Sequence, residues 1–330
     1  MRAGKIRRYH NEGLKQLMDV PTILRNMRDA IFVVIGLIQS YFLLNKIKPD
    51  VIFTRGSYVG VPVCLAAKLR GIKYITHDSD SLPSLTNRVI GRWSALHLVA
   101  LDKAIYPYPK DKTITTGIPI SRNFTVINSE RREEYRQKLN IPKKCKLIFV
   151  TGGGLGAKSL NDTLIEIAPN MLAEFKDLII AHVVGRKHEE EISIAYDKNL
   201  SNDKRSRVKV IGYTDEVYLY SGASDLVVTR AGATTLAELA IQGVACIILP
   251  NSNLVAGHQL KNAKILEDGQ AAIVINDKDL EDNPNILAKE ISGLLKDNNK
   301  RKTLAKNLLS FGHPDADKQI ARIIIKTAEA

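Results

Sequence analysis

Two glycine-containing turns in the second half of the chain have the residue types needed to bind phosphate. The first, VTGGGLGAKSLND, places Gly152, Gly153, Gly154 and Gly156 between an apolar run and a helical stretch. Glycine permits tight turning and close backbone approach, and a helix N-terminus attracts phosphate through free N–H groups and its dipole. The spacing matches neither GxGxxG nor a P-loop. A diphosphate or sugar-phosphate contact is one interpretation, and a simple tight strand–helix turn is the other.

The second turn lies in VTRAGATTLAELA, where another apolar run leads into a helix. Gly232 and Ala233 begin that helix, and Thr234 and Thr235 could cap its free N–H groups. Such a helix start can face phosphate.

An arginine and a glutamate accompany the second turn. Glu238 lies about one and a half turns into the helix, where its carboxylate could accept two hydrogen bonds from a ribose diol. The alternative is an exposed acid that stabilises the helix dipole. We expect Arg230 to fix the turn or the nearby cleft.

Polar side chains also follow other apolar runs. In NSNLVAGHQLKNA, His258 precedes Gln259 and Asn262, which lie three apart and therefore share a helix face. Their amides suit sugar hydroxyls, although capping and solvent exposure explain them equally well.

The segment THDSDSLPSLTN places His77, Asp78, Asp80 and Asn87 after an apolar run in the first half of the chain. The two aspartates hint at a metal ligand pair, but no other ligand cluster in the sequence supports one. The three cysteines are scattered and form no CxxC pair, which indicates neither a metal site nor a disulfide framework. We expect no metal.

Short apolar runs alternate with helical stretches, which predicts an α/β protein with parallel sheets and crossover helices. A charged stretch at residues 122–144 is interpreted as a linker into the first helix of a second domain. Ligands in such sheets lie beyond the carboxyl ends of the strands, where the polar turns fall. The runs are residues 50–56, 73–80, 95–101 and 112–120 before the linker, and 145–154, 178–185, 207–213, 223–232, 244–251 and 271–277 after it.

The net charge of +13 favours an anionic partner, such as nucleic acid, a phosphorylated ligand or a membrane surface. Basic residues are dispersed, and no arginine-rich tract with interleaved aromatics is present, so nucleic acid is not expected.

The most apolar stretch is AIFVVIGLIQSYFLL at residues 30–44, with basic residues on both sides. It is too short to span a bilayer. It is either a core helix or a helix resting on lipid, with Phe32 and Leu37 as contacts.

Taken in order and spacing, these motifs resemble the MurG family of GT-B glycosyltransferases. The resemblance covers nearly the whole chain. It rests on KIRRYH, KPDVIFTRGSYVGVP, THDSDSLPSLTN, TGIPIS, VTGGGLGAKSLN, SDLVVTRAGATTLAELA, HQLKNA and HPDADKQIA. Members of the family transfer N-acetylglucosamine from UDP-GlcNAc to lipid I, which gives lipid II for peptidoglycan synthesis.

The resemblance implies an α/β GT-B fold with two Rossmann-like domains facing a cleft. Residues 1–122 would form the acceptor and membrane-side domain, and residues 123–312 the UDP-sugar domain. The C-terminal helix, residues 313–330, would pack back on the first domain. The enzyme would act as a peripheral protein on the cytoplasmic face of the cell membrane, with an anionic membrane surface as a partner.

The resemblance also assigns roles to residues. Glu238 would bind the ribose hydroxyls, the two glycine turns would face the diphosphate, and backbone groups at Tyr213 and Thr214 would read uracil. Gln259 and Asn262 match positions that contact the GlcNAc hydroxyls. The expected substrate-binding residues are Gly152, Gly153, Gly154, Gly156, Tyr213, Thr214, Arg230, Gly232, Ala233, Thr234, Glu238, His258, Gln259, Asn262, Asn87, Gly56, Tyr58 and Ser121.

The implied mechanism is direct displacement at the anomeric carbon with inversion. Helix N-termini and backbone N–H groups would meet the charge that develops on UDP, so neither a metal nor a cofactor is expected. The acceptor hydroxyl requires a general base.

The sequence departs from the family at three places. The family's GGTGGH-like loop, whose histidine is the candidate base, has no counterpart, so we expect an N-terminally truncated first domain and leave the base unassigned. His77 belongs to a different motif and does not replace that base. Gly154 and Leu155 stand where the family usually has Ser and Gln, and Ser121 stands in place of an arginine.

Two other functions remain open from the sequence alone. A related GT-B enzyme could use another lipid acceptor, such as diacylglycerol. Alternatively, the chain could be an inactive or partner-dependent UDP-sugar-binding fragment.

Overall fold

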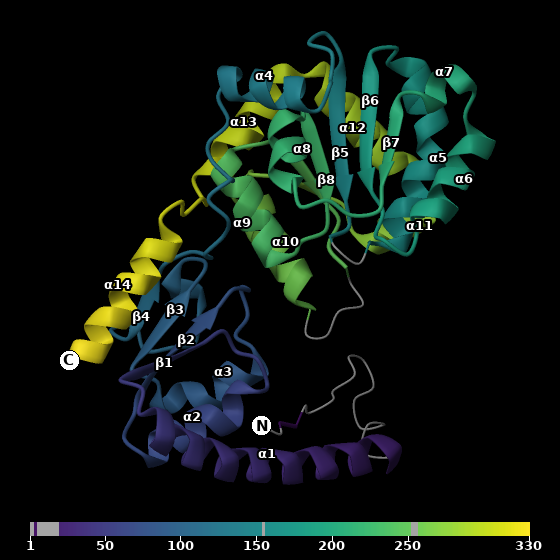
Figure 1. Cartoon of the computed structure of the whole chain (residues 1–330). Helices are drawn as coiled ribbons and strands as arrows, with labels where there is room; N and C mark the ends of the chain where they lie inside the picture. The colour runs from purple at the N-terminus through teal and green to yellow at the C-terminus, as the bar shows by residue number, and fades with distance from the viewer. Residues whose placement is uncertain (1–2, 5–19, 154–155, 252–256) are drawn as a thin grey trace. The chain divides into compact units, whose positions relative to one another are not determined.

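The computed structural model describes residues 3–4, 20–153, 156–251 and 257–330 (Figure 1). Within these ranges the chain forms two compact units. The first contains the residues up to Pro119, the segment Asn253–His258 and the C-terminal segment Asp315–Ala330, and the second contains Ile120–Ser252 and Gln259–Pro314. The limits expected from the sequence are 122/123 and 312/313. Each unit is built on its own parallel sheet.

The first unit has a four-stranded parallel sheet in the order β1-β2-β3-β4. Its strands are β1 (Val51–Thr54), β2 (Lys73–Asp78), β3 (Leu96–Val99) and β4 (Thr113–Thr115). Its helices are α1 (Val20–Ile47), α2 (Gly60–Leu69), α3 (Leu85–Ile90) and α14 (Ala316–Glu329), with single 3-10 turns η2 (Gly91–Trp93) and η3 (Lys103–Ile105).

The alternation of β2 side chains decides which helices cover which face of this sheet. Successive strand residues point to opposite faces. Tyr74 is buried with Cys64 of α2 and Leu44 of α1. Its neighbour Ile75 is buried instead with Ile320 of α14. The sheet is therefore covered by α1, α2 and α3 on one side and by the C-terminal helix on the other (Figure 1).

The second unit has a six-stranded parallel sheet in the order β10-β9-β8-β5-β6-β7. Its strands are β5 (Lys146–Thr151), β6 (Leu178–Val183), β7 (Val208–Ile211), β8 (Leu226–Thr229), β9 (Cys246–Ile248) and β10 (Ile273–Val274). Its helices are α4 (Ser129–Lys138), α5 (Lys158–Glu174), α6 (Glu189–Asn199), α7 (Asn202–Arg205), α8 (Val217–Ala223), α9 (Ala233–Gln242), α10 (His258–Asp268), α11 (Asp277–Asp282), α12 (Asn285–Lys296) and α13 (Asn298–Leu309).

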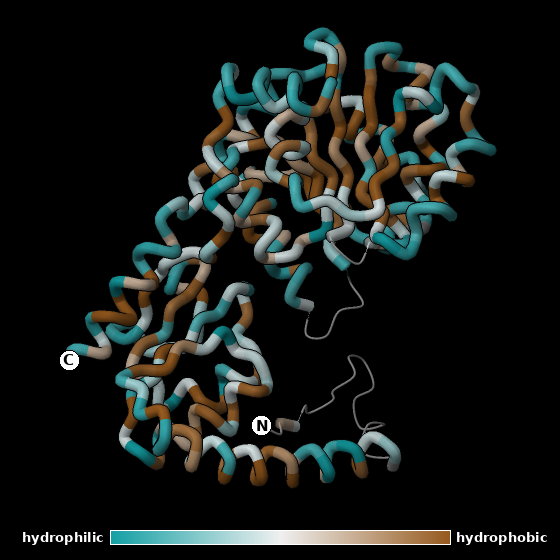
Figure 2. Tube along the Cα trace, in the orientation of Figure 1, coloured by the Kyte–Doolittle hydropathy of each residue, from teal (hydrophilic) through white to brown (hydrophobic). Residues whose placement is uncertain are grey.

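The core of the second unit has two apolar layers, one on each face of the sheet. Ile148 and Val150 of β5 are buried in one layer with α5 and α12, and Leu147 and Phe149 in the other with α4, α8 and α9. Strands buried on both faces carry continuous apolar runs, visible as the brown strands in Figure 2. All ten apolar runs of the sequence correctly predicted strands, including the less buried β1 and β10.

Helix α1 corrects one expectation. It is 28 residues long, not confined to residues 30–44, and Pro21–Ile47 is long and apolar enough to cross a membrane by length and composition. Only 17% of its most apolar window is buried, so it is not a core helix. Leu37 packs against the buried cluster around Leu44, however, so it is not the lipid contact proposed from the sequence.

Candidate functional site

The topology of the second unit places a binding site at one edge of its sheet. The strand order β7-β6-β5-β8-β9-β10 is that of a Rossmann fold, in which the connections reverse direction between β5 and β8. Ligands bind in the crevice at this switch point, beyond the carboxyl ends of the strands. Thr151 and Thr229 are paired at the ends of β5 and β8, so both glycine turns begin at the same level.

The turn after β5 requires its glycines for steric reasons. Gly153 and Gly156 have φ angles of +85° and +76°, which side-chain-bearing residues rarely adopt. A Cβ on Gly156 would lie 2.2 Å from the Val184 carbonyl oxygen, and one on Gly152 would lie 2.5 Å from the Ala157 Cβ. Gly154 and Leu155 lie outside the described residues.

Two N–H groups of this turn already donate hydrogen bonds within the turn itself. Gly153 donates its N–H to the Thr151 hydroxyl (3.1 Å), and Gly156 donates to the Gly153 carbonyl (3.0 Å). The turn also leads into α5, whose N-cap residue Ala157 provides no side-chain cap. The first turn of α5 is therefore the better phosphate-binding group on this side of the switch point.

The start of α9 offers similar free donors. Its N-cap is Gly232, which has no side chain to cap the helix, and the first helical hydrogen bond runs from Leu236 N–H to the Gly232 carbonyl (2.9 Å). The Thr234 and Thr235 hydroxyls make no hydrogen bond within the described ranges, so the capping expected from the sequence is not observed. The N–H groups of Ala233, Thr234 and Thr235 remain available to a ligand.

Glu238 is half-buried one turn behind these donors, and it is not the exposed helix acid of the alternative interpretation. Burial alone raises the pKa of its carboxyl to about 7. Across the part of the chain that is described, no hydrogen bond or ion pair reaches this carboxylate. A desolvated carboxylate without donors is costly unless a ligand supplies them.

Arg230 has a structural position at the end of β8. Its Nη1 donates to the Leu249 carbonyl (3.1 Å) and pairs with the Asp277 carboxylate, and its Nη2 donates to the Ser159 hydroxyl. Arg230 and Asp277 are both buried. The guanidinium therefore ties β8, β9, α5 and α11 together, and it fixes the turn as expected. Its Nε makes no hydrogen bond with any residue that the structure describes.

The end of β7 carries the residues expected to meet uracil. Tyr213 is 43% exposed, donates its hydroxyl to Asp215 (2.6 Å), and lies under the Arg186 guanidinium at 4.0 Å from the ring centroid. Thr214 accepts a hydrogen bond from the Glu216 N–H (3.0 Å). Sequence reasoning missed Arg186, although it directly follows Gly185 at the end of the adjacent strand β6.

Helix α10 brings one amide to the turn after β8 and another to the residues that follow β9. The Asn262 side chain is buried and donates from Nδ2 to the Ala231 carbonyl (3.3 Å). The Gln259 Oε1 accepts a hydrogen bond from the Asn251 N–H (2.8 Å). His258 is the half-buried first residue of the helix. The Asn262 amide is thus adjacent to the switch point, and the Gln259 amide lies beside the residues that follow β9.

In the first unit, Asn87 and Gly56 are brought together. The Asn87 Nδ2 donates to the His77 carbonyl (3.0 Å) and to the Asp78 Oδ1 (2.9 Å), while its buried Oδ1 has no partner among the described residues. A Cβ on Gly56 would lie 2.9 Å from the Asn87 Nδ2. Tyr58, in the same turn as Gly56, is 43% exposed.

His77 and Asp78 are both held inside the first unit. His77 is fully buried, its Nε2 donates to the Gly117 carbonyl (2.9 Å), and burial lowers its pKa. Asp78 accepts from the Tyr108 hydroxyl (2.7 Å), a partner that sequence reasoning missed. Ser121 is exposed and accepts from the Asn123 N–H (3.3 Å). The described residues contain no group of three or more His, Cys, Asp or Glu that could hold a metal.

Comparison with known proteins agrees with this geometry. The sequence models of the glycosyltransferase family 28 C-terminal and N-terminal domains match residues 147–320 and 12–97. The crystal structure of Acinetobacter baumannii MurG has a TM-score of 0.72 at 24% identity, covering 90% of this chain and 79% of that one. The two parallel-sheet units therefore define a glycosyltransferase of the GT-B class.

Two curated relatives are named UDP-N-acetylglucosamine–N-acetylmuramyl-(pentapeptide) pyrophosphoryl-undecaprenol N-acetylglucosamine transferase. The one from Halothermothrix orenii is 34% identical over 298 residues, 89% of this chain and 79% of its own length. The one from Acetivibrio thermocellus is 32% identical over 290 residues, 88% of this chain and 76% of its own length. The chain belongs to this family, the MurG family of hexosyltransferases.

Proposed function

We propose that the chain transfers N-acetylglucosamine from UDP-GlcNAc to lipid I, with inversion at the anomeric carbon, and so forms lipid II in peptidoglycan synthesis. Two observations support the proposal together. The relatives carry this activity in their names. The second unit presents two helix starts without a side-chain cap, and a carboxylate at its switch point that is unpaired among the residues described.

The half-buried Glu238 carboxylate is the observation that carries the donor assignment. It would accept hydrogen bonds from the two ribose hydroxyls, which supply the donors that the protein does not. The free N–H groups of Ala233, Thr234 and Thr235 would hold the diphosphate. Arg230 would act through the turn it holds, because both of its terminal nitrogens are already bonded within the unit.

The mechanism follows from these donors. As the bond between the anomeric carbon and the UDP oxygen breaks, negative charge grows on the diphosphate. The starts of α5 and α9 are fixed before the reaction, so they stabilise this charge without reorganisation. The acceptor hydroxyl loses its proton to a general base. His77 does not take this role, because its side chain is fully buried inside the first unit.

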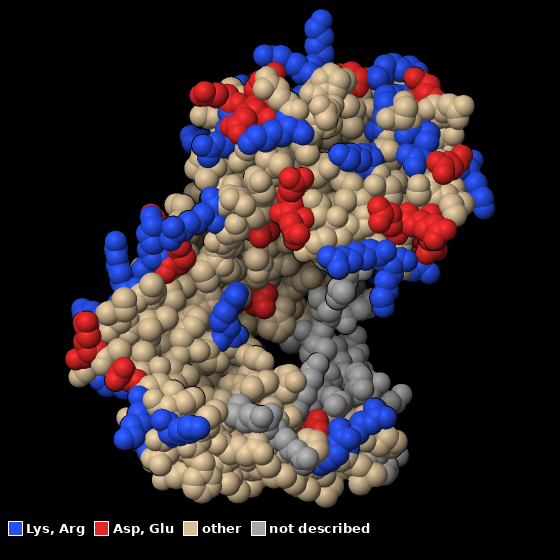
Figure 3. Space-filling model, in the orientation of Figure 1, with Lys and Arg blue, Asp and Glu red and all other residues tan. Residues whose placement is uncertain are grey.

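Contact with the membrane is assigned to α1. Ten large apolar side chains along the helix are exposed, including Leu24, Ile31 and Phe42 at 61%, 60% and 68%. In Figure 3 the surface of α1 is uncharged over most of its length. Basic residues flank the apolar stretch at Arg28 and Lys46. An apolar helix surface with basic flanks suits an anionic membrane surface, so the enzyme would work as a peripheral protein at the cytoplasmic face.

The decisive experiment offers radiolabelled UDP-GlcNAc with either a lipid I analogue or diacylglycerol. Transfer to the lipid I analogue, with inverted anomeric configuration in the product, supports the proposal. Transfer to diacylglycerol alone would instead identify a related glycolipid synthase. UDP binding without any transfer would leave the donor assignment standing and reject activity of this chain alone.

The donor assignment has its own test. Glu238→Ala should weaken UDP binding by about 1–3 kcal/mol, because the ribose hydroxyls lose their acceptor. Isothermal titration measures this loss. Glu190→Ala is the matched control, since Glu190 lies exposed in the first turn of α6. An equal affinity in wild type and Glu238→Ala would remove Glu238 from the site.

A further inference from the structure

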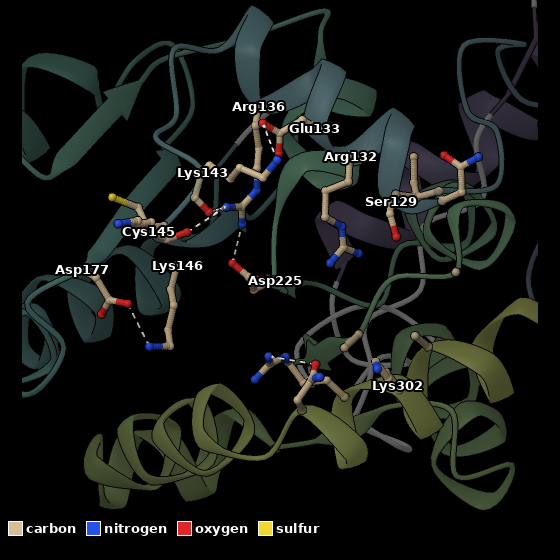
Figure 4. Close-up of a pocket in the computed structure, with 18 residues that line it drawn as sticks. Ser129, Arg132, Glu133, Arg136, Lys143, Cys145, Lys146, Asp177, Asp225 and Lys302 are labelled. Carbon is tan, nitrogen blue, oxygen red and sulfur yellow. Dashed lines mark hydrogen bonds and ion pairs between the residues drawn. The ribbon is translucent and has the colours of Figure 1, made fainter.

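A basic pocket of about 830 Å³ lies in the second unit, at the amino ends of its strands (Figure 4). Cys145, Asp177, Asp225 and Ala245 line it, and each immediately precedes one of the strands β5, β6, β8 and β9. The helices α4 and α13 and the loop residues Ile127, Lys143, Lys144 and Gly243 contribute most of the remaining wall. The residues proposed to bind the donor nucleotide lie at the carboxyl ends of the same strands, and this side of the sheet is called the nucleotide edge. This pocket is therefore separate from the donor site.

The charges in the pocket do not balance. Seven cationic and three acidic side chains line it. The three carboxylates are paired as Arg136–Asp225 (2.7 Å), Lys146–Asp177 (3.0 Å) and Lys143–Glu133 (3.6 Å). Four cationic side chains have no carboxylate partner among the residues the structure describes: Arg132, Lys144, Arg301 and Lys302.

Of these four side chains, Arg132 gives the clearest indication that the pocket binds an anion. It lies on α4 and is half-buried, and no residue in the described ranges makes a hydrogen bond or ion pair with its guanidinium. Figure 4 shows its side chain reaching into the pocket, with Lys302 on the facing helix. Burial lowers the pKa of Arg132, and the neighbouring Arg136 and Arg301 lower it further while Asp225 opposes them. A desolvated cation beside like charges is unfavourable without an anion.

The neighbouring guanidinium groups are held in place by backbone carbonyls. Arg136 donates from Nε to the Ala223 carbonyl (3.0 Å) and from Nη1 to the Cys145 carbonyl (2.8 Å). Arg301 donates from Nη1 to the Leu294 carbonyl. Their positions are therefore set before any ligand arrives, which lowers the cost of ordering them on binding.

We propose that this pocket binds a small anion carrying two or more phosphate groups. Guanidinium and ammonium groups from two facing helices supply charge-assisted hydrogen bonds to phosphate oxygens. The volume exceeds what one phosphate needs and lies in the range of small-molecule sites. Inorganic polyphosphate and a nucleotide share this chemistry, and Ile127 and Ala305 offer apolar wall for a nucleoside.

The test is isothermal titration with tripolyphosphate at about 0.15 M ionic strength, where weak surface attraction is screened. The Arg132→Gln/Lys302→Gln protein should lose at least about tenfold in affinity, since charge-assisted hydrogen bonds carry this much. The matched control is Lys138→Gln/Lys306→Gln, which removes the same charge from exposed positions on α4 and α13 outside the pocket. The control should stay within about twofold of wild type.

Several outcomes would overturn the proposal. Absence of binding to wild type at millimolar tripolyphosphate would do so, as would equal weakening in the pocket variant and the control. A large loss in Glu238→Ala would place the anion at the nucleotide edge instead. Melting curves check the fold, and Arg132→Gln should not lower Tm because the Arg132 side chain makes no hydrogen bond within the described part of the chain.

A second titration, with ATP in the Glu238→Ala background, distinguishes the two sources of the ligand. Tighter binding than tripolyphosphate, lost in the pocket variant, would identify a nucleotide. Equal or weaker binding, again lost in the pocket variant, would identify a bare polyphosphate. If the pocket substitutions weaken neither ATP binding nor tripolyphosphate binding, the result would contradict the proposal.

Discussion

The Glu238 carboxyl has different proton affinities in the folded and unfolded chain. Burial raises its pKa from the ordinary value of 4.5 to about 7. Between these two pH values the folded protein holds a proton that the unfolded chain has released. Folding stability therefore falls as pH rises through this window, and the cost of ionising Glu238 is fully present above it.

Replacing Glu238 by glutamine removes this titration while keeping the side-chain shape. In the absence of nucleotide, Glu238→Gln should raise Tm by a few degrees at pH 8 and by much less at pH 5, where the wild-type carboxyl is already protonated. Calorimetric melts at both pH values measure the difference. The same Tm increase at both would show that ionisation of Glu238 is not the cause.

The residues that the sequence could and could not assign differ in the range of their contacts. Gly156 and Glu238 were recognisable because a turn and a helix position are local properties. The partners of Arg230 were not, because Ser159 and Asp277 lie 71 and 47 residues away in sequence. The basic pocket was not predicted from the sequence for the same reason. Arg132 and Lys302 come from helices far apart in the chain.

At the scale of elements, the Arg230–Asp277 pair holds four elements together at the switch point. Arg230→Leu leaves the buried Asp277 carboxylate without its cation, which should destabilise the second unit by about 3–5 kcal/mol. Urea unfolding followed by circular dichroism measures this. The double variant Arg230→Leu/Asp277→Asn should recover part of the loss, since no uncompensated charge remains. A single variant as stable as wild type would show that the pair contributes little.

Strands and helices were unequally predictable. Strands buried on both faces, such as β5 and β8, require apolar residues throughout, so their runs indicated strands, although the structure trims most runs at the ends. The extent of α1 was underestimated because Arg25 and Arg28 interrupt its apolar pattern. Helices tolerate such residues where the side chain reaches solvent, and the Arg28 side chain is 58% exposed.

Helix α1 gives a prediction about lipid binding. Ile31→Ser/Phe42→Ser removes two exposed apolar side chains, so binding to anionic vesicles should weaken at least tenfold, given about 1.5–3 kcal/mol for each large side chain. Vesicle co-sedimentation measures the binding. Val126→Ser/Ile194→Ser is the control, because both residues are exposed in the second unit. Undiminished binding in the α1 variant would exclude this helix as the lipid contact.

At the scale of the whole molecule, the first unit depends on the last helix of the chain. Ile320 of α14 is buried with Ile75 and Leu98 of the first sheet. Deleting residues 315–330 should therefore unfold or loosen the first unit while the second unit still binds UDP. Limited proteolysis with mass spectrometry would detect this as selective cleavage before residue 119. Equal protection of both units would mean that α14 is dispensable for the first.

The same helix affects the order in which the protein can fold during synthesis. The second unit is nearly continuous in sequence, and its residues have all been translated before α14 begins. The first unit is translated earlier, yet we expect one face of its sheet to remain uncovered until α14 has been translated. A nascent chain usually completes its N-terminal domain first. Here the N-terminal unit must wait, with Ile75 and Leu98 exposed to chaperones throughout translation of the rest.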